Sequence, residues 1–310
     1  MFIKNNLSWI NIDIACDCLE LNRSSYYEWI KNEEVHAIKA ISRDKLVRLI
    51  KVEHDNSKKR YGATKISVNL KKAGVQCCKN TVAKLMRKNN LCSIVGKKFK
   101  ATTNSTHNHA VFDNILDRRF VVDKPNCAWV GDITYIPTNE GWLYLATVID
   151  LYSNKIIGHA MSDRINKQLV ITALTNAIKA RKYPTGVIVH SDRGSQYASN
   201  AYKNLLTQYK LVGSMSRKGN CWDNAVAENF FGLIKKEYIN HVEFTTRDLA
   251  KLGIFDYIEG WYNTQRIHSK LGYLTPNEFE ALSDPATIFN VNKIIKKSDN
   301  VIKEIKSAQL

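Results

Sequence analysis

The spacing of hydrophobic residues changes near residue 129, and this change constrains the fold more than any other feature. Three β-rich runs follow one another between residues 129 and 161, and the first two are separated by hairpin-type residues at 138–141. Helical periodicity then alternates with short apolar runs. This order predicts an α/β domain with a mixed sheet. We expect strands at 129–136, 142–151, 155–161, 186–190 and 211–214, and helices at 168–181, at 201–209 and from 224 onward.

The chain before residue 95 has helical periodicity instead. Ser25 followed by Glu28 fits a capping box, which predicts that a short helix opens there. A second helical set is expected from Ser42, with a break at 61–62 and a turn at Gly74. These patterns predict a partial helix-turn-helix segment over 1–40 and a helix-turn-helix DNA-binding domain over 41–95.

The charge of the chain is concentrated in this helical part. The 310 residues carry 46 Lys and Arg against 29 Asp and Glu, a formal net charge of +17. Residues 1–110 hold 21 of the basic and 9 of the acidic side chains, and residues 56–110 hold 13 basic side chains and no acidic one. Such a stretch repels itself unless a polyanion approaches, so its partner is expected to be nucleic acid or an anionic membrane.

A membrane-spanning segment is not expected. The longest mostly apolar run, 142–152, is short and contains Asp150, whereas a spanning helix needs about 20 apolar residues. The amino terminus has no secretory signal pattern, which favours a cytoplasmic, nucleoid-associated protein. The seven cysteines are odd in number and form no C-x-x-C pair, so neither a disulfide framework nor a zinc ribbon is indicated.

The last helix of the basic region has one apolar and one polar face. Asn80 is expected to cap it, and its apolar face consists of Val82, Leu85 and Met86. A single basic helix is more often a solvated face of a small bundle than a recognition helix. The absence of acids over 56–110 favours a recognition helix in the major groove of double-stranded DNA. The expected DNA contacts are Thr81, Lys84, Arg87 and Lys88.

Three acids of the α/β region occupy positions where carboxylates are unusual. Asp132 lies inside the first expected strand, Asp192 ends the fourth, and Glu228 lies in the helix after 224. Asp150 also lies in a β-rich run, and we interpret it as structural. Three carboxylates without a His or Cys cluster suit two Mg²⁺ or Mn²⁺ ions, which promote phosphodiester displacement.

Glu228, Phe231 and Lys235 recur at helical spacing and are expected to share one helix face. At 1.5 Å per residue, Lys235 lies roughly 10 Å along the helix from Glu228. A lysine at that distance from a catalytic acid suits contact with a DNA phosphate.

The spacing of these residues resembles a known signature. Asp192 and Glu228 are separated by 35 residues, as in the Asp, Asp, Glu signature of retroviral integrases and related transposases. The sequences HSDRGSQY at 190–197, SMSRKGNCWDNAVAENFFGLIKKE at 214–237 and WYNTQRIHSKLGYLTP at 261–276 resemble the second-reading-frame (OrfB) transposase of the bacterial family named after insertion sequence three. RSSYYEW at 23–29 and RYGATKI at 60–66 resemble its amino-terminal part.

The resemblance implies a five-stranded ribonuclease-H-like core over 125–285, between a linker at 96–124 and a basic tail at 286–310. It implies cleavage of the element's ends by water and strand transfer by the released 3′-hydroxyl, with two metal ions held by Asp132, Asp192 and Glu228. Lys235 matches a DNA-contacting lysine. The implied partners are the terminal repeats and target DNA, with oligomer formation on DNA and fusion to an upstream-frame helix-turn-helix protein.

A motif after the core also matches the family, at Trp261, Tyr262, Asn263, Arg266 and His268. We interpret Trp261 and Tyr262 as core residues because large aromatic side chains are usually buried, and Arg266 and His268 as candidate DNA contacts. The motif ends with a capping box at 275–278. Two alternatives to a transposase remain at this stage: a catalytically silent DNA-binding regulator and a structure-specific nuclease of the same fold.

Overall fold

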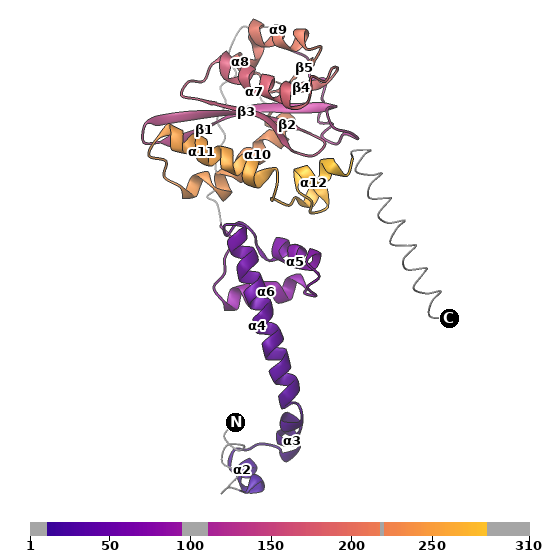
Figure 1. Ribbon diagram of the computed structural model, residues 1–310, viewed down its shortest axis with the longest axis vertical. Helices are drawn as coiled ribbons and strands as arrows, with labels where there is room; N and C mark the ends of the chain where they lie inside the picture. The colour runs from indigo at the N-terminus through magenta and orange to yellow at the C-terminus, as the bar shows by residue number, and fades with distance from the viewer. Residues whose placement is uncertain (1–10, 95–110, 218–219, 284–310) are drawn as a thin grey trace, which may run out of the picture. The chain divides into compact units, whose positions relative to one another are not determined.

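The computed structural model describes residues 11–94, 111–217 and 220–283. The chain divides into two compact units, Met1–Ser93 and Ile94–Leu310, which are described separately (Figure 1). The expected basic tail at 286–310 lies outside the described residues, as do residues 1–10 of the expected first segment and residues 96–110 of the expected linker.

The first unit is entirely helical. Its helices are α2 (Ile12–Cys18), α3 (Arg23–Lys31), α4 (Glu33–Asn56), α5 (Ala63–Lys72) and α6 (Lys79–Lys88). The capping box predicted at Ser25 is wrong, because the Asn22 side chain caps α3 by accepting a hydrogen bond of 2.9 Å from the Ser24 amide. The helical start predicted at Ser42 is also wrong, because α4 runs without interruption from Glu33.

Helices α5 and α6 form the predicted helix-turn-helix pair. Gly74 has φ +80°, a left-handed conformation that glycine adopts without steric cost, and it reverses the chain after α5. The cap predicted at Asn80 is wrong: Cys78 precedes α6, and its Sγ accepts from the Thr81 amide at 3.4 Å. The apolar face of α6 is buried as expected, at Val82, Leu85 and Met86.

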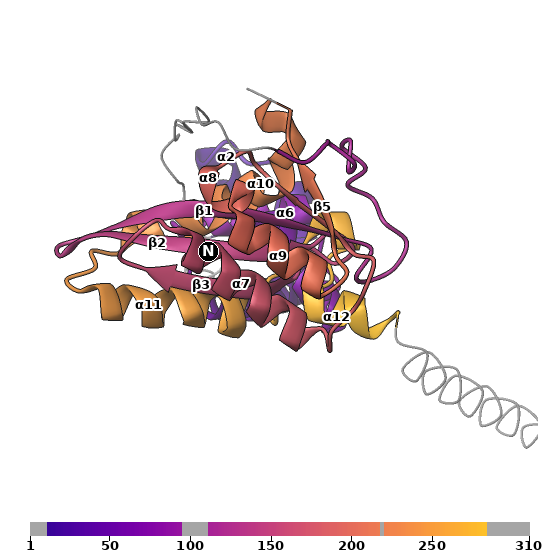
Figure 2. The same ribbon diagram turned by 90° about the horizontal axis from the view of Figure 1, so that it is seen from above.

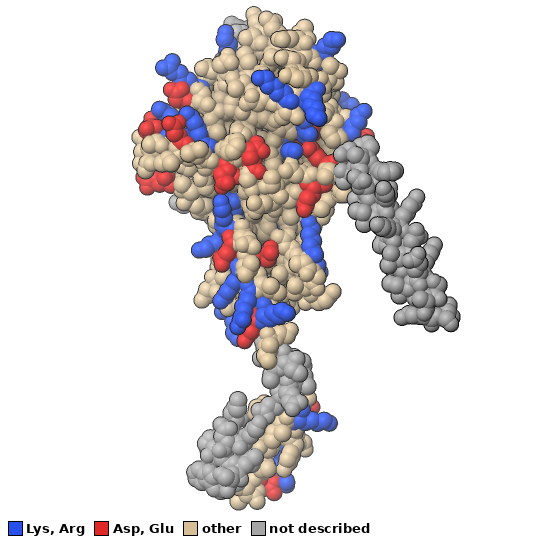
Figure 3. Space-filling view, in the orientation of Figure 1, with Lys and Arg blue, Asp and Glu red and all other residues tan. Residues whose placement is uncertain are grey.

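The opposite face of α6 is exposed, and it carries the four residues predicted to contact DNA: Thr81, Lys84, Arg87 and Lys88. In Figure 3, Lys and Arg predominate over Asp and Glu on the visible surface of α4, α5 and α6. The helix therefore presents a polar, basic side to solvent, while its contact with DNA stays a prediction.

The second unit contains a five-stranded sheet of order β3-β2-β1-β4-β5. The strands are β1 (Ala128–Thr138), β2 (Gly141–Asp150), β3 (Ile156–Ser162), β4 (Ile188–Ser191) and β5 (Val212–Met215). Strands β1, β2 and β3 pair antiparallel, whereas β4 pairs parallel to β1 and to β5. The predicted mixed sheet is therefore confirmed, and each strand lies within two residues of its predicted position.

Helices cover both faces of the sheet (Figures 1 and 2). One face packs against α7 (Lys167–Ala180), α8 (Ser195–Ala198) and α9 (Asn200–Gln208), and Trp129 and Val189 belong to this core. The other face is covered by α10 (Ala225–Glu237) and α11 (Arg247–Phe255). A π-helix, η3 (Asp256–Tyr262), continues α11, and α12 (Pro276–Ala281) follows.

Helix α12 begins with the predicted capping box, in which Thr275 and Glu278 hydrogen-bond each other's backbone amides. In the described part of the chain, no helix is long and apolar enough to cross a membrane. The cysteines whose side chains are described are all free thiols, so no disulfide joins them.

Candidate active site

The three predicted acids come from neighbouring elements of the second unit, and two of them act electrostatically on the third, Asp132. The last paired residues of the parallel strands β1 and β4 are Val130 and His190, and Asp132 and Asp192 follow each of them by two positions. Side chains alternate along a strand, so Asp132 lies on the face of Val130, opposite to that of Trp129. Helix α10 covers that face and carries Glu228 in its first turn.

The acids are close enough to affect one another's ionisation. The pKa of Asp132 is raised well above its ordinary value, first by burial and then by the negative charge of Asp192, with a smaller contribution from Glu228. The Ile133 amide and the Lys235 ammonium oppose this rise. The pKa of Glu228, whose side chain is exposed, is raised by partial loss of solvent around its carboxylate. Asp132 is therefore the central member of the group, because both other acids act on it.

Backbone amides orient two of the three carboxylates. Asp132 Oδ1 accepts a hydrogen bond of 2.8 Å from the Ile133 amide, and Asp192 Oδ1 accepts one of 2.9 Å from the Gly194 amide. A Cβ at position 194 would lie 3.0 Å from Asp192 Oδ1. Glycine at this position therefore lets the loop after β4 close around the carboxylate.

The donor set fits a divalent cation. Carboxylate oxygens are hard ligands, which Mg²⁺ and Mn²⁺ prefer, and a cation would relieve the repulsion that raises the pKa of Asp132. Among the described residues, however, no group of three or more His, Cys, Asp and Glu side chains is gathered tightly enough to hold a metal ion as it stands. The three carboxylates therefore interact electrostatically without forming a closed set of ligands.

Lys235 lies deeper than the sequence suggested. Its side chain is buried, and its Nζ lies 4.6 Å from the centroid of the Tyr135 ring on β1. Burial lowers the pKa of Lys235, and the charge of Asp132 opposes that shift. Phe231 is buried and Glu228 is exposed, so the shared helix face turns from solvent at Glu228 toward β1 at Lys235.

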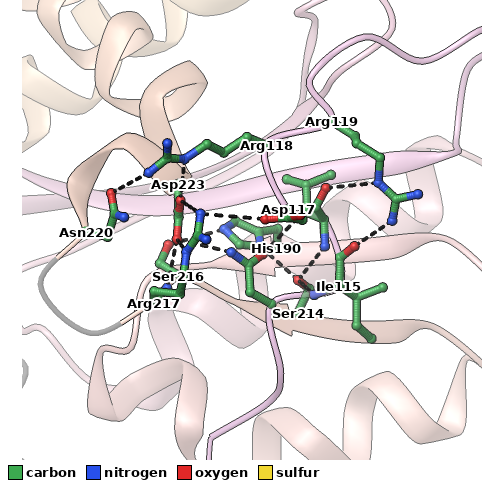
Figure 4. Close-up of polar contacts among 12 residues, drawn as sticks. Ile115, Asp117, Arg118, Arg119, His190, Ser214, Ser216, Arg217, Asn220 and Asp223 are labelled. Carbon is green, nitrogen blue, oxygen red and sulfur yellow. Dashed lines mark hydrogen bonds and ion pairs between the residues drawn. The ribbon is translucent and has the colours of Figure 1, made fainter.

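Two residues near the acids were not singled out from the sequence. Tyr197 is buried beside Gly131, and its pKa is raised well above the ordinary value, mainly by burial and next by the charge of Asp132. His190 is fully buried between Ser214 and Ser216, and its ring nitrogens lie 2.9 and 3.2 Å from their hydroxyl oxygens (Figure 4). Both belong to HSDRGSQY, so the motif itself was the available signal.

Burial lowers the pKa of His190 to about 4, which keeps the ring neutral at neutral pH. A neutral imidazole can donate from one nitrogen and accept at the other, which suits its position between two hydroxyl groups. His190 therefore braces the end of β4 against β5, immediately before Asp192.

The motif after the core is a packing and ion-pair element. Trp261 and Tyr262 are buried, which confirms their interpretation as core residues. Asn263 is also buried, and its side chain bonds both the amide and the carbonyl of Ile156 on β3 at 3.0 Å. The motif therefore holds the helices after α10 against the sheet.

Arg266 is buried in an ion pair, and its contact with DNA stays a prediction. Its side chain is 7% exposed and bonds the Glu237 carboxylate at the end of α10, with Arg266 Nη2 donating to Oε1 at 2.7 Å. Arg266 Nε and Nη2 both donate to the Glu237 carboxylate, so these donors are already occupied. His268 is half-buried against the Tyr262 ring, with ring centroids 5.0 Å apart. Its role as a DNA contact stays a prediction.

Asp150 has the structural role assigned to it. It is fully buried, and its carboxylate accepts hydrogen bonds of 3.0 Å from the amides of Asn126 and Tyr152. Arg181 Nη2 lies 3.3 Å from Asp150 Oδ2 and also pairs with Glu280. An arginine and two amides thus satisfy this acid.

Comparison with known proteins gives matches along both units. Residues 122–221 and 228–283 match the Integrase core domain family, and residues 42–99 match the HTH-like domain family. Among solved structures, the catalytic core domain of HTLV-2 integrase in complex with magnesium aligns with 51% of this chain and 97% of its own, at 18% identity and a TM-score of 0.41. A simian T-cell lymphotropic virus intasome covers 75% of this chain and 74% of its own, at 15% identity and a TM-score of 0.43. Likenesses at this level carry no further inference.

Similarity to bacterial proteins is much higher. An uncharacterized 31 kDa protein of insertion element IS600 from Shigella sonnei is 41% identical over 264 residues, which are 85% of this chain and 96% of that protein. Transposase InsF for insertion sequence IS3A from Escherichia coli (strain K12) is 39% identical over 280 residues, 90% of this chain and 97% of that protein. The chain therefore belongs to the insertion-sequence transposase family that includes InsF and has an integrase core domain.

Proposed function

We propose that this chain binds the ends of its own insertion sequence and catalyses divalent-metal-dependent cleavage and strand transfer of DNA at Asp132, Asp192 and Glu228. The observation that carries the proposal is the position of Asp132. It lies in the sheet, and the two other acids, from the end of β4 and from α10, both raise its pKa. Clustered acids at a site that also includes a lysine and the end of a parallel strand are typical of catalysis rather than of packing.

The three carboxylates would hold two Mg²⁺ or Mn²⁺ ions between them. When bound, such ions supply activation of the attacking oxygen and stabilisation of the leaving oxygen in a phosphodiester displacement. The chain's own contribution is orientation. The Ile133 and Gly194 amides hold Oδ1 of Asp132 and of Asp192, which limits the rotation of each carboxylate.

Two successive displacements at phosphorus account for transposition chemistry. In the first, the oxygen of water bonds to phosphorus at the element's end, and the bond to the 3′-oxygen breaks and releases a 3′-hydroxyl. In the second, that 3′-oxygen bonds to a phosphorus of target DNA, and a target 3′-oxygen leaves. Each step forms one phosphorus–oxygen bond and breaks one, so no oxidant or other co-reactant is needed.

The remaining DNA contacts are assigned to both units. Thr81, Lys84, Arg87 and Lys88 on the exposed face of α6 would contact the terminal repeats. Lys235 would contact DNA near the acids, and His268 is a further candidate. We also propose that the protein acts as an oligomer on DNA, at the bacterial nucleoid, and that fusion to an upstream-frame helix-turn-helix protein extends its recognition of the ends.

Replacement of Asp192 by Asn tests this function. We expect Asp192→Asn to abolish Mg²⁺-dependent cleavage and joining of element ends, while the dissociation constant for end DNA changes little. Asp163→Asn is the matched control, because Asp163 is an exposed aspartate of the same unit at the end of β3. Gel assays of cleavage and joining, with DNA binding measured in parallel, separate the two effects.

The same assay distinguishes the alternatives. Joining by Asp192→Asn at the wild-type rate would contradict the assignment of the acids. A wild-type chain that binds ends but neither cuts nor joins them would be a regulator. Cleavage without transfer to a second duplex would indicate a nuclease.

A further inference from the structure

A further carboxylate, that of Asp223, lies outside the group of Asp132, Asp192 and Glu228 and is more completely buried than any of these three. It belongs to the 3-10 turn η1 (Cys221–Asn224), which directly precedes α10, and its side chain is 0% exposed. Asp223 was not among the residues predicted from the sequence. A buried carboxylate is costly unless it is fully paired, so the partners of Asp223 define what it does.

Cationic and amide donors surround Asp223 (Figure 4). Its Oδ1 accepts from Arg118 Nε at 2.7 Å and from Arg217 Nη2 at 2.9 Å. Its Oδ2 accepts from the Arg217 amide at 2.9 Å, from Arg217 Nε at 3.0 Å and from Asn114 Nδ2 at 3.1 Å. The pKa of Asp223 is accordingly held well below its ordinary value, first by the side-chain hydrogen bond from Arg217. Asp223 therefore stays ionised throughout the neutral range.

These contacts join three segments that are distant in sequence. Arg118 and Asn114 precede β1, and Arg118 Nη2 also donates to Asn220 Oδ1 at 2.9 Å. Arg217 follows Ser216, which is tied to the strand end that carries Asp192. The Ser216 amide donates to the Ser191 carbonyl at 2.9 Å, and Arg193 Nε donates to the Ser216 carbonyl at 2.6 Å. The Asp223 carboxylate thus links the loop of Asp192 to the turn before α10.

The next residue, Asn224, connects the same turn to β1. Asn224 is 4% exposed, and its Nδ2 donates to the carbonyl of Gly131, the residue before Asp132, at 3.4 Å. Helix α10 has no side-chain cap at its first residue, Ala225. The turn at 221–224 is therefore what sets the start of α10, and Glu228 lies one helical turn beyond it.

We propose that Asp223 is a positioning residue for Glu228: by holding the turn before α10 to Arg118 and Arg217, it sets the distance of Glu228 from Asp132 and Asp192. The inference rests on the proposed function of the three acids. Asp223 touches neither DNA nor metal in this account and acts only through the start of α10. Groups that orient metal ligands in this way are worth about 10- to 100-fold in metal affinity or activity.

The test uses the full-length chain with Mg²⁺ and a labelled duplex from the ends of the element that encodes it. Asp223→Asn keeps the size of the side chain but turns an amide donor toward the arginine donors. We expect kcat for joining to fall about 10- to 100-fold, with a higher Mg²⁺ concentration for half-maximal joining and an unchanged KM for the duplex. A purely structural role would instead lower the folded fraction and leave kcat per folded molecule and the Mg²⁺ requirement as in the wild type.

Asp117→Asn is the matched control. Asp117 pairs with the same arginine, Arg217, at 3.6 Å but is 68% exposed. An exposed ion pair contributes little, so activity should stay within about twofold of the wild type. Asp223→Glu should recover part of the lost kcat, because it restores the charge.

If Asp223→Asn does not fold, Arg118→Gln is measured in its place. Arg118 is 44% exposed, and its replacement leaves the ion pair between Arg217 and Asp223 intact. Its expected result is a smaller loss of kcat with the same rise in Mg²⁺ requirement. The inference is overturned if the folded variants at 223 and 118 join DNA at the wild-type rate and Mg²⁺ requirement. Inactivity of the wild-type chain, or activity of Asp192→Asn, would instead overturn the proposed function.

Discussion

Asp132 and Asp150 stand on strands that pair with each other, yet their carboxylates meet different partners. Asp150 is enclosed by two amides and by Arg181, whereas Asp132 has one amide and two other acids acting on it. Burial raises the pKa of both groups. Burial alone therefore does not distinguish the two carboxylates, whereas their hydrogen-bond partners and neighbouring charges do.

The wider motifs, rather than the strands alone, predicted a catalytic role for Asp132 and a structural role for Asp150, and the catalytic role stays a prediction. The sequence did not identify Asp223, although it lies in the motif at 214–237, because its partners Asn114 and Arg118 lie more than 100 residues away. Arg266 was predicted to contact DNA because of its place in the motif after the core. Its ion pair with Glu237 could not be predicted, because that contact depends on how α10 packs.

Lys235 offers a prediction at the residue scale. Its ammonium lies over the Tyr135 ring, and the negative charge of Asp132 raises its pKa against the effect of burial. The Lys235 side chain is therefore a buried neighbour of Asp132 and not a surface group. We expect Lys235→Ala to weaken the binding of end DNA in the active site more than the binding of Mn²⁺. Fluorescence anisotropy for DNA and electron paramagnetic resonance for Mn²⁺ measure the two quantities.

Lys236→Ala is the control for this variant, because the next residue on α10 carries the same charge but is exposed. It should behave as the wild type in both measurements. Loss of Mn²⁺ and DNA affinity in equal proportion by Lys235→Ala would count against a role in DNA contact.

At the scale of elements, the close packing of α7 on β3 makes a sharp prediction. A Cβ at position 158 would overlap the Ala173 carbonyl oxygen and lie 2.5 Å from the Ala177 amide nitrogen, both backbone atoms of α7. Neither can move without shifting the helix. We expect Gly158→Ala to lower the free energy of unfolding by about 1–3 kcal/mol, the usual cost of overpacking. Thermal melting of the chain measures it.

Gly232→Ala is the same substitution with the opposite expected sign. No neighbouring atom lies within 4 Å of a Cβ at 232, in the middle of α10. Alanine is favoured over glycine in a helix by about 0.5–1 kcal/mol, so this variant should melt at the wild-type temperature or above it. A melting temperature of Gly158→Ala equal to that of Gly232→Ala would refute the packing argument.

Helix α6 gives a second prediction at this scale. Each phosphate neutralised by a cation contributes about 0.9 to the slope of log K against log salt concentration. The double variant Lys84→Ala/Lys88→Ala should therefore reduce the magnitude of this slope by about 1.8 if both lysines contact phosphates. Titrations with end DNA at several salt concentrations measure it.

The control for α6 is Lys179→Ala, an exposed lysine in the last turn of α7 in the other unit. Its salt slope should equal that of the wild type. A wild-type slope for the α6 double variant would remove α6 from the DNA interface.

Helix boundaries show where local sequence signals mislead. Ser25 and Asn80 are good capping residues by type, but the caps are Asn22 and Cys78. Capping depends on which side chain reaches a free amide, and several candidates within three residues satisfy the pattern equally. Thr275 was identified correctly because Glu278 and Pro276 restrict the start of α12 to one position.

For the whole molecule, the sequence predicted the order of strands and helices in the second unit, because the hydrophobic spacing that distinguishes strands from helices is local to each segment. It also located the three acids. It did not predict the π-helix at 256–262 or the enclosure of Arg266 and Asp223, because these depend on contacts between distant segments. The predicted connection before β1 proved more than a linker, since Asn114 and Arg118 brace the turn before α10.

The density of net positive charge differs between the two units. Residues 1–93 carry 18 basic and 9 acidic side chains, a net +9 over 93 residues, whereas residues 94–310 carry 28 basic and 20 acidic ones, a net +8 over 217 residues. A strongly cationic helical unit suits contact with a polyanion. The second unit has the lower density of net charge, and its acids include the three at the candidate site and others, such as Asp150 and Asp223, that pair with arginines.

The central claim is that Asp132, Asp192 and Glu228 jointly hold the divalent ions of the reaction, although these three carboxylates do not form a closed ligand set among the described residues. Anomalous diffraction from a crystal of the protein soaked in Mn²⁺ tests this most directly. We predict anomalous peaks within coordinating distance of all three carboxylates, and loss of those peaks in Asp192→Asn. Peaks confined to other acids, such as the exposed aspartates, or no peak at the three carboxylates at saturating Mn²⁺, would contradict the account.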